Sequence, residues 1–140
     1  VYFFLLDGDQ VLLSDERIAG QSCTKWPGGG LEFGEGPLEC VCREAMEELG
    51  QSIEPGALVH ATGGFVRSAW RPDEQVLCHY YLAKLSAPAR FPTADSPMDF
   101  SEGRGQSLRW VHLQTFDEQG LTFATDREAC SALKAHLGIQ

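Results

Sequence analysis

The stretch GGGLEFGEGPLECVCREAMEELG, residues 28–50, joins three consecutive glycines to a segment rich in glutamate. Six of the 20 acidic residues of the chain lie in it: Glu32, Glu35, Glu39, Glu44, Glu47 and Glu48. Like charges this close repel one another, which lowers stability unless something offsets the repulsion. A bound metal ion, an arginine side chain, or water around an exposed helix face could each do so.

Residues 37–49 are predicted to form an amphipathic helix. Pro37 suits the first position of a helix, where its missing N–H is not needed, and Gly50 suits the position that ends one. At about 100° per residue, four apolar or small side chains share one side of this helix. They are Leu38, Cys42, Ala45 and Leu49. We expect this side to pack against the core.

Three carboxylates converge on a separate face of the same helix, those of Glu44, Glu47 and Glu48. Exposed helices usually mix acidic and basic residues at i and i+4, whereas Glu44 and Glu48 carry the same charge at that spacing. Carboxylate oxygens are the hard ligands that Mg²⁺ and Mn²⁺ prefer. The helix alone is compatible with a metal site and with a solvated acidic face. Arg43 lies beside this face, where it can reach an acid outside the helix.

The spacing around this helix gives a more specific signal. Gly29 is followed after five residues by Glu35, and Glu35 is followed after seven residues by the run REAMEELG at residues 43–50. This pattern resembles the Nudix box, G-x5-E-x7-R-E-U-x-E-E-x-G-U, in which U is a bulky aliphatic residue. Every glycine, arginine and glutamate of the box is in register. Ala45 and Gln51 replace the two aliphatic residues, and neither is expected to touch the chemistry.

The resemblance implies an enzyme that hydrolyses the diphosphate bond of a nucleoside diphosphate derivative, with Mg²⁺ or Mn²⁺ as cofactor. It implies four metal ligands: the side chains of Glu44, Glu47 and Glu48 and the backbone carbonyl of Gly28. Glu35 is expected to pair with Arg43 and so fix the glycine loop against the helix. The alternative is a nucleotide-sensing domain of the same family that binds without catalysis, which the intact acidic residues of the box disfavour.

The box does not fix the general base of the reaction. The resemblance allows either a glutamate of the box, here Glu47, or an acid on a distant loop. Glu102 is the distal candidate, because it lies in a proline- and glycine-rich loop expected at residues 86–106. Glu74 and Asp99 are weaker alternatives. An acid in such a loop is more often an exposed residue without a catalytic role.

Aromatic residues are candidates for stacking on a nucleotide base, namely Phe33, Phe65 and Trp70. Tyr81 is a fourth, although aromatic residues in strands more often belong to the core. His79 in the same strand is expected to be structural. Residues 65–68, Phe-Val-Arg-Ser, lack the markers of the ADP-ribose and dinucleoside polyphosphate subfamilies, and the NADH-type motif is also absent. A nucleoside triphosphate, a nucleotide sugar and a coenzyme all stay open as substrates.

The length of 140 residues predicts a single domain, residues 1–140, of the α+β or α/β class. Strands are expected at residues 1–6, 10–14, 57–70, 75–85 and 108–113. The first two are joined by an Asp-Gly turn typical of a hairpin. A capping box at Thr125–Glu128 is expected to open a second helix that ends near Leu137. With the resemblance, this order of elements implies a Nudix-type α-β-α sandwich with a mixed sheet.

Composition limits the partners of the protein. The 11 basic residues are scattered and the net charge is −9, which argues against binding a nucleic acid duplex through a basic surface. A small polyanion is compatible if a divalent cation mediates. The longest apolar run, VYFFLL, is too short to span a membrane, and no basic segment precedes it as in a signal peptide. The pattern leaves open whether further residues precede this run.

The five cysteines are an odd number and contain no C-x-x-C motif. We expect buried or half-buried free thiols and a cytoplasmic location, where thiols stay reduced. Cys40 and Cys42 should point to different sides of the helix, which argues against a metal site there. A homodimer is compatible with the resemblance, although no exposed apolar stripe in the sequence identifies an interface.

Overall fold

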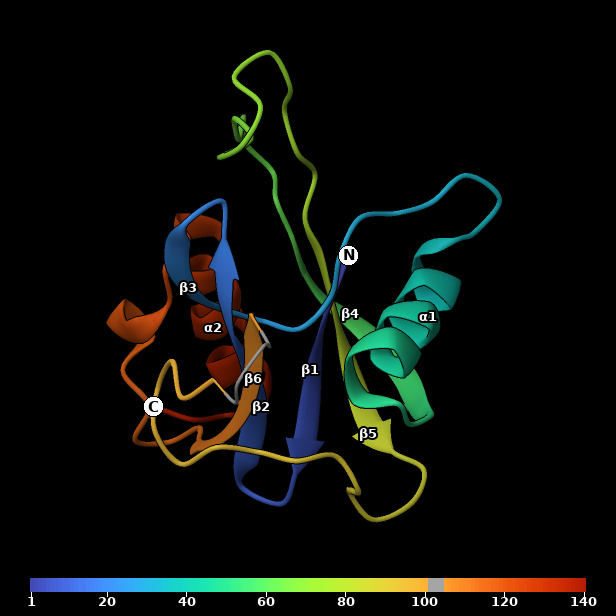
Figure 1. The fold of residues 1–140 in the computed structure, drawn as a ribbon, viewed down its shortest axis with the longest axis vertical. Coiled ribbons are helices and arrows are strands. Elements are labelled where there is room, and N and C mark those ends of the chain that lie inside the picture. Colours follow the sequence, from blue (N-terminus) through green and yellow to red (C-terminus); the bar gives the residue numbers. More distant parts are fainter. Residues whose placement is uncertain (101–104) are drawn as a thin grey trace.

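The computed structural model describes residues 1–100 and 105–140 (Figure 1). Its strands are β1 (Tyr2–Asp7), β2 (Gln10–Ile18), β3 (Gln21–Lys25), β4 (Ile53–Ala61), β5 (His79–Leu85) and β6 (Gln106–His112). Its helices are α1 (Pro37–Leu49), the short 3-10 helix η1 (Glu118–Gly120) and α2 (Ala124–His136). The strands form one sheet of order β3-β2-β1-β5-β4, in which β6 also pairs with β2. β1 and β5 are parallel and the other pairs are antiparallel, so the sheet is mixed.

The two α-helices cover opposite faces of this sheet (Figure 1). Successive side chains of a strand face opposite sides, so alternate residues of β1 and β2 reach different helices. The α1 side buries Phe3, Leu5 and Leu12, and the α2 side buries Phe4, Val11 and Leu13. The expected α-β-α sandwich with a mixed sheet is confirmed. Within the described residues, no helix is both long and apolar enough to cross a membrane.

β2 pairs with three strands, and two of them share one of its edges, so that β1 and β2 separate after a short paired segment. One edge of β2 pairs with β6 along residues 10–16. β1 and β3 share the other edge, where β1 pairs only at residues 10–11 and β3 pairs at residues 14–18. The chain that follows β3 runs past the start of β1, where the Phe3 N–H donates to the Pro27 carbonyl at 3.0 Å. The separation of β1 and β2 thereby brings the glycine loop to the α1 side of the sheet.

β3 is a strand that the sequence does not indicate, and β2 continues to Ile18 rather than ending at residue 14. The β3 segment QSCTK has one apolar residue, which is typical of a loop. In the structure Thr24 is nevertheless buried. Its hydroxyl donates to Asp15 at 2.7 Å, and its N–H donates to the Thr122 hydroxyl at 2.8 Å. These partners satisfy the polar groups of β3, which allows a polar strand to be buried.

β4 and β5 are both shorter than the strands expected at residues 57–70 and 75–85. The segment between them, residues 62–78, protrudes from the sheet (Figure 1, yellow-green). Gly63 and Gly64 lie where the chain leaves β4. Glycine has no side chain to pack on a sheet and weakens a strand, which accounts for the early end of β4.

α1 has the expected bounds but is rotated about its axis relative to the expectation. Its buried residues are Cys40, Val41, Ala45 and Leu49. Leu38, which is 46% exposed, and Cys42 face solvent, although both were expected to be inside. The rotation turns Glu44 and Glu48 toward the glycine loop instead of placing all three carboxylates on a separate face. The side chains of Glu44 and Glu48 are therefore partly buried.

All five cysteines are free thiols, as expected. Four are buried, whereas Cys42 is exposed, contrary to the expectation. Cys40 and Cys42 do point to different sides of α1. Burial raises the pKa of Cys40 and of Cys130 to about 11, so these two thiols stay protonated at neutral pH.

α2 begins at Ala124, and the predicted capping box is wrong. Phe123 occupies the N-cap position without a side-chain hydrogen bond, and Thr125 lies inside the first turn. Asp126 is buried and accepts a hydrogen bond of 2.7 Å from the Tyr80 hydroxyl of β5. The start of α2 is therefore fixed by packing against the sheet and not by a side-chain cap.

Replacing Asp126 by asparagine is expected to change the pH dependence of stability. Burial raises the pKa of Asp126 from 3.8 to about 6. A raised folded-state pKa means that the contribution of this carboxyl is complete below its unfolded pKa and is lost as pH rises through its folded pKa. The wild type loses this contribution as the pH rises from 3.8 to about 6, whereas Asp126→Asn has no such carboxyl to lose. We therefore expect the unfolding free energy of the variant, relative to that of the wild type, to rise by about 3 kcal/mol over this pH range and then to stay level.

Urea unfolding of both proteins between pH 4 and pH 8 measures this difference. Any change in stability that the amide itself causes is the same at every pH, and such a change does not alter how the difference in unfolding free energy depends on pH. Asp73→Asn, which makes the same chemical change at an exposed loop position, is the matched control. A wild-type-to-variant difference that is the same at every pH would contradict the buried, proton-retaining Asp126.

Candidate functional site

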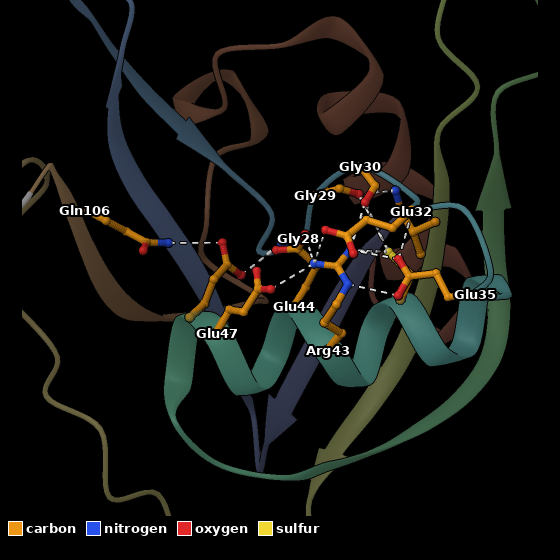
Figure 2. A network of polar contacts seen from close by, with 12 residues as sticks. Gly28, Gly29, Gly30, Glu32, Glu35, Arg43, Glu44, Glu47 and Gln106 are labelled. Carbon is orange, nitrogen blue, oxygen red and sulfur yellow. Dashed lines mark hydrogen bonds and ion pairs between the residues drawn. The ribbon is translucent and has the colours of Figure 1, made fainter.

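The glycine loop lies directly against α1 (Figure 2). A side chain at Gly29 would overlap the Glu44 carboxylate, and a side chain at Gly28 would overlap the backbone of Val1 and Tyr2. Gly28 also has a φ of +142°, which residues with a side chain rarely adopt. Gly28 therefore requires glycine, whereas at Gly29 the missing side chain leaves the space that the Glu44 carboxylate occupies. Together the two glycines let the backbone approach the carboxylates of the helix.

Arg43 is the centre of the network that joins this loop to α1 (Figure 2). Its Nε and Nη2 donate to the two carboxylate oxygens of Glu35 at 2.9 and 2.8 Å, and Nη2 also donates to the Gly30 carbonyl at 2.9 Å. Its Nη1 donates to Glu44 at 3.0 Å and to Glu47 at 3.1 Å. These bonds from Arg43 lower the pKa of Glu35 to about 2. The expected pair of Arg43 and Glu35 is present, and the arginine offsets part of the repulsion among the glutamates.

Glu48 is held in a different way from Glu44 and Glu47. One of its oxygens accepts from the Gly28 N–H at 3.1 Å and the other accepts from Gln106 Nε2 at 3.1 Å. Both donors are neutral, and among the described residues no basic side chain forms an ion pair with Glu48. Burial raises the pKa of Glu48 to about 7.

The chemistry of these donors fits a hard divalent cation. Carboxylate and carbonyl oxygens suit Mg²⁺ or Mn²⁺, and Glu48 offers a carboxylate that lacks a cationic partner. In the observed rotamers Arg43 holds Glu44 and Glu47, and no three acidic, histidine or cysteine side chains of the described residues form a ready metal-binding group. A cation would therefore compete with Arg43 for these two carboxylates. The expected ligands Gly28, Glu44, Glu47 and Glu48 lie on α1 and the adjoining loop, and their role stays a prediction.

A cavity of about 700 Å³ adjoins Glu48. Its lining includes Glu48, Phe91, Thr93, Asp99 and Gln106. The three distal candidates for the general base have different positions. Asp99 lines this cavity, and Glu74 lies in the protruding segment, where it pairs with Arg71 at 3.0 Å. Glu102 lies outside the described residues.

A second cavity, of about 310 Å³, lies between the protruding segment and the start of α2. Its apolar lining includes Tyr2, Val66, Trp70, Val76 and Phe123. Trp70 and Phe123 pack edge to face with 6.2 Å between ring centres. Lys25 and Arg67 also line this cavity. An aromatic wall with two nearby positive charges suits a planar base that carries phosphate groups.

Of the aromatic candidates named from the sequence, Trp70 is the one that lines this second cavity. Phe65 is 70% exposed and lies under Arg67, and Phe33 is fully exposed in the loop before α1. Tyr81 packs on the α1 side of the sheet. Neither Phe33 nor Phe65 lines either of the two cavities described above. Phe123 was missed, because no spacing in the sequence links it to Trp70.

Gln51, which departs from the box pattern, has a structural explanation. Its side chain is only 3% exposed, and its amide donates to the carbonyls of Ala87 and Pro88 at 3.0 Å each. Its oxygen accepts from the Arg90 N–H at 3.0 Å. All of its polar atoms are thus paired, and Gln51 fixes the segment that leads to Phe91 in the larger cavity.

Comparison with protein families gives one match across most of the chain. The family described as NUDIX domain matches residues 1–130. An RNA pyrophosphohydrolase of Acinetobacter baylyi is 34% identical over 119 residues, which cover 76% of this chain and 70% of that protein. An RNA pyrophosphohydrolase of Teredinibacter turnerae is 31% identical over 67 residues, which cover 48% of this chain and 39% of that protein.

Solved structures resemble the chain over nearly its whole length. A MutT NUDIX hydrolase from Burkholderia pseudomallei superposes with a TM-score of 0.67 and 27% identity, and the match covers 94% of each chain. A NUDIX hydrolase from Nitrosomonas europaea superposes with a TM-score of 0.70 and 18% identity, covering 99% of this chain and 88% of that one. At 18% identity the second likeness concerns the fold alone.

Proposed function

The chain belongs to the NUDIX family and is a pyrophosphohydrolase, and from that premise we propose that it hydrolyses a nucleoside diphosphate derivative with the help of Mg²⁺ or Mn²⁺. The observation that carries this proposal is the contact between the glycine loop and α1. Gly28 and Gly29 bring the backbone against Glu44 and Glu48, with Glu47 one turn away and Arg43 between them.

Glu44, Glu47, Glu48 and the Gly28 carbonyl would hold the cation. A divalent cation, when bound, neutralises charge on diphosphate oxygens and lowers the pKa of bound water. Arg43 and Glu35 fix the loop relative to α1 and so set the distance between the carbonyl and the carboxylates. An acidic protein can bind an anionic diphosphate in this way, because its carboxylates first recruit the cation.

The general base belongs to the same proposal. Glu47 is the candidate within the box, because its side chain is 57% exposed and can reach substrate and solvent. Asp99 is the distal candidate that lines the cavity beside Glu48. Glu102 is still a candidate for the general base, on the grounds of the sequence alone.

The nucleoside would occupy the smaller cavity, with its base against Trp70 and Phe123. Substituting Trp70 by alanine is expected to raise KM about tenfold with little change in kcat, because base–aromatic stacking is worth about 1–3 kcal/mol. Steady-state kinetics measure both constants. Phe65→Ala is the matched control, since Phe65 is an exposed aromatic residue of the same segment that does not line the cavity. Equal effects of the two substitutions would contradict this position for the base.

The 5′ end of an RNA is a second candidate substrate, favoured by the names of the two relatives. The net charge of −9 disfavours a long contact with a nucleic acid backbone, so only the terminal nucleotide would be bound. A cytoplasmic location is part of this proposal, supported by the five free thiols. A homodimer stays a prediction.

The test is phosphate or mononucleotide release from a panel of substrates with Mg²⁺, with Mn²⁺ and with EDTA. The panel holds nucleoside triphosphates, nucleotide sugars, a dinucleotide coenzyme and a 5′-triphosphorylated RNA oligomer. Cleavage of one class that disappears with EDTA supports the proposal and identifies the substrate. Metal-dependent binding without any cleavage would instead support the nucleotide-sensing alternative.

A further inference from the structure

Gln106 connects the candidate metal site to the sheet. It is the first residue of β6 and pairs with Glu16 of β2, so its side chain lies on the α1 side of the sheet. Its Nε2 donates to Ser14 Oγ at 2.9 Å and to Glu48 Oε1 at 3.1 Å. Gly28 holds the other oxygen of Glu48. The glycine loop and β6 therefore hold the two oxygens of the Glu48 carboxylate from different sides.

The neighbours of Gln106 fix which way its amide points. Ser14 has a single hydroxyl hydrogen, and this hydrogen is donated to Glu16 Oε2 at 2.8 Å. Ser14 can therefore only accept from Gln106, and an ionised Glu48 can also only accept. Both hydrogens of the Gln106 amide are used, so a reversed amide would place an oxygen against two acceptors.

The chain of hydrogen bonds continues beyond Ser14 to the smaller cavity. Glu16 Oε2 also accepts from Lys25 Nζ at 2.9 Å, and Lys25 is 7% exposed. Lys25 lines the smaller cavity and lies 5.4 Å from the centre of the Tyr2 ring. The order Lys25, Glu16, Ser14, Gln106, Glu48 therefore runs without a break from one cavity to the other. Each member is held by its neighbours, which limits the rotamers open to Gln106.

We propose that Gln106, itself oriented by Ser14, is a positioning residue that holds the Glu48 carboxylate in the direction required to bind the catalytic cation. This inference rests on the proposed function, in which Glu48 is a metal ligand. Partners that orient metal ligands without touching the metal typically change metal affinity by 10- to 100-fold. Neither residue belongs to the box, and the sequence alone gives no reason to single them out.

Direct binding of Mn²⁺, followed by electron paramagnetic resonance without substrate, tests the proposal. Gln106→Leu keeps the approximate volume and removes both donors, and we expect it to weaken the tightest Mn²⁺ site about tenfold. Ser14→Ala should weaken it less, and Ser14→Thr, which keeps the hydroxyl, should restore it. The double variant Ser14→Ala/Gln106→Leu should bind no more weakly than Gln106→Leu, because Ser14 acts through Gln106. Gln114→Leu, at an exposed position, is the matched control.

Three results would overturn the proposal, and they differ in what else they affect. Wild-type affinity in a folded Gln106→Leu variant contradicts the positioning role and leaves the proposed function intact. If the double variant loses Mn²⁺ affinity by the product of the two single losses, Ser14 does not act through Gln106. A wild-type protein that binds no Mn²⁺ and cleaves nothing in the substrate panel contradicts both the inference and the proposed function. Thermal unfolding of each variant separates a lost carboxylate orientation from a lost fold.

Discussion

Replacing Glu47 by glutamine is expected to lower turnover by about three orders of magnitude while the protein stays folded, equivalent to about 4 kcal/mol of transition-state stabilisation. Glu47 is 57% exposed, and its contact with Arg43 can be kept by the carbonyl oxygen of a glutamine. The substitution therefore removes a charge next to the reaction without removing a structural contact. Activity is measured on the substrate that the panel identifies, and folding by circular dichroism and thermal unfolding.

The helix itself supplies the control for this experiment. Glu39→Gln makes the same chemical change at an exposed position in the first turn of α1. We expect Glu39→Gln to keep turnover within about twofold of the wild type, since a single distant surface charge is screened by salt. Full activity of Glu47→Gln, or an equal loss in both variants, would eliminate the special role of Glu47.

Removing Arg43 should affect both stability and activity. The guanidinium holds Glu35, Glu44, Glu47 and the Gly30 carbonyl together, and an alanine would leave the carboxylates facing one another. Hydrogen bonds to charged groups contribute about 1.5–3 kcal/mol. We therefore expect Arg43→Ala to lower the unfolding free energy and to reduce activity about a hundredfold. Chemical unfolding and steady-state kinetics give the two values.

Two further variants distinguish loss of the hydrogen bonds made by Arg43 from loss of one positive charge. Arg71→Ala removes an arginine from a pair in which the side chains are 69% and 51% exposed, and such pairs contribute about 0–1 kcal/mol. Arg43→Lys keeps the charge but loses the fork that matches a carboxylate, so it should recover only part of the stability. If Arg43→Lys behaved like the wild type, charge alone would explain the site and the bidentate contact with Glu35 would be unimportant.

The sequence predicted the parts of the site that depend on spacing along one helix. Pro37 and Gly50 marked the bounds of α1, and the register of Glu35 with Arg43 predicted the ion pair that closes the loop. The rotation of α1 was not predictable in this way. It is set by contacts with side chains of β1 and β2 such as Phe3 and Leu12, which are far away in the sequence.

Elements that depend on tertiary partners were also missed. β3 is polar and becomes a strand only because β2 and Thr122 satisfy its polar groups. Gln106 has no fixed spacing from the box, and the pairing of β6 with β2 brings it to Glu48. The capping box at Thr125 failed because burial of Asp126 against Tyr80 outweighs a local hydrogen bond.

The exposure of Cys42 has a practical consequence for experiments on this protein. The other four cysteines are buried, so a maleimide reagent applied to the native protein should modify one position. That position lies on the solvent side of α1, away from the face that carries Glu44 and Glu48. A fluorophore or spin label there would report on the movement of the helix when ligands bind, without any engineered cysteine and without touching the carboxylates.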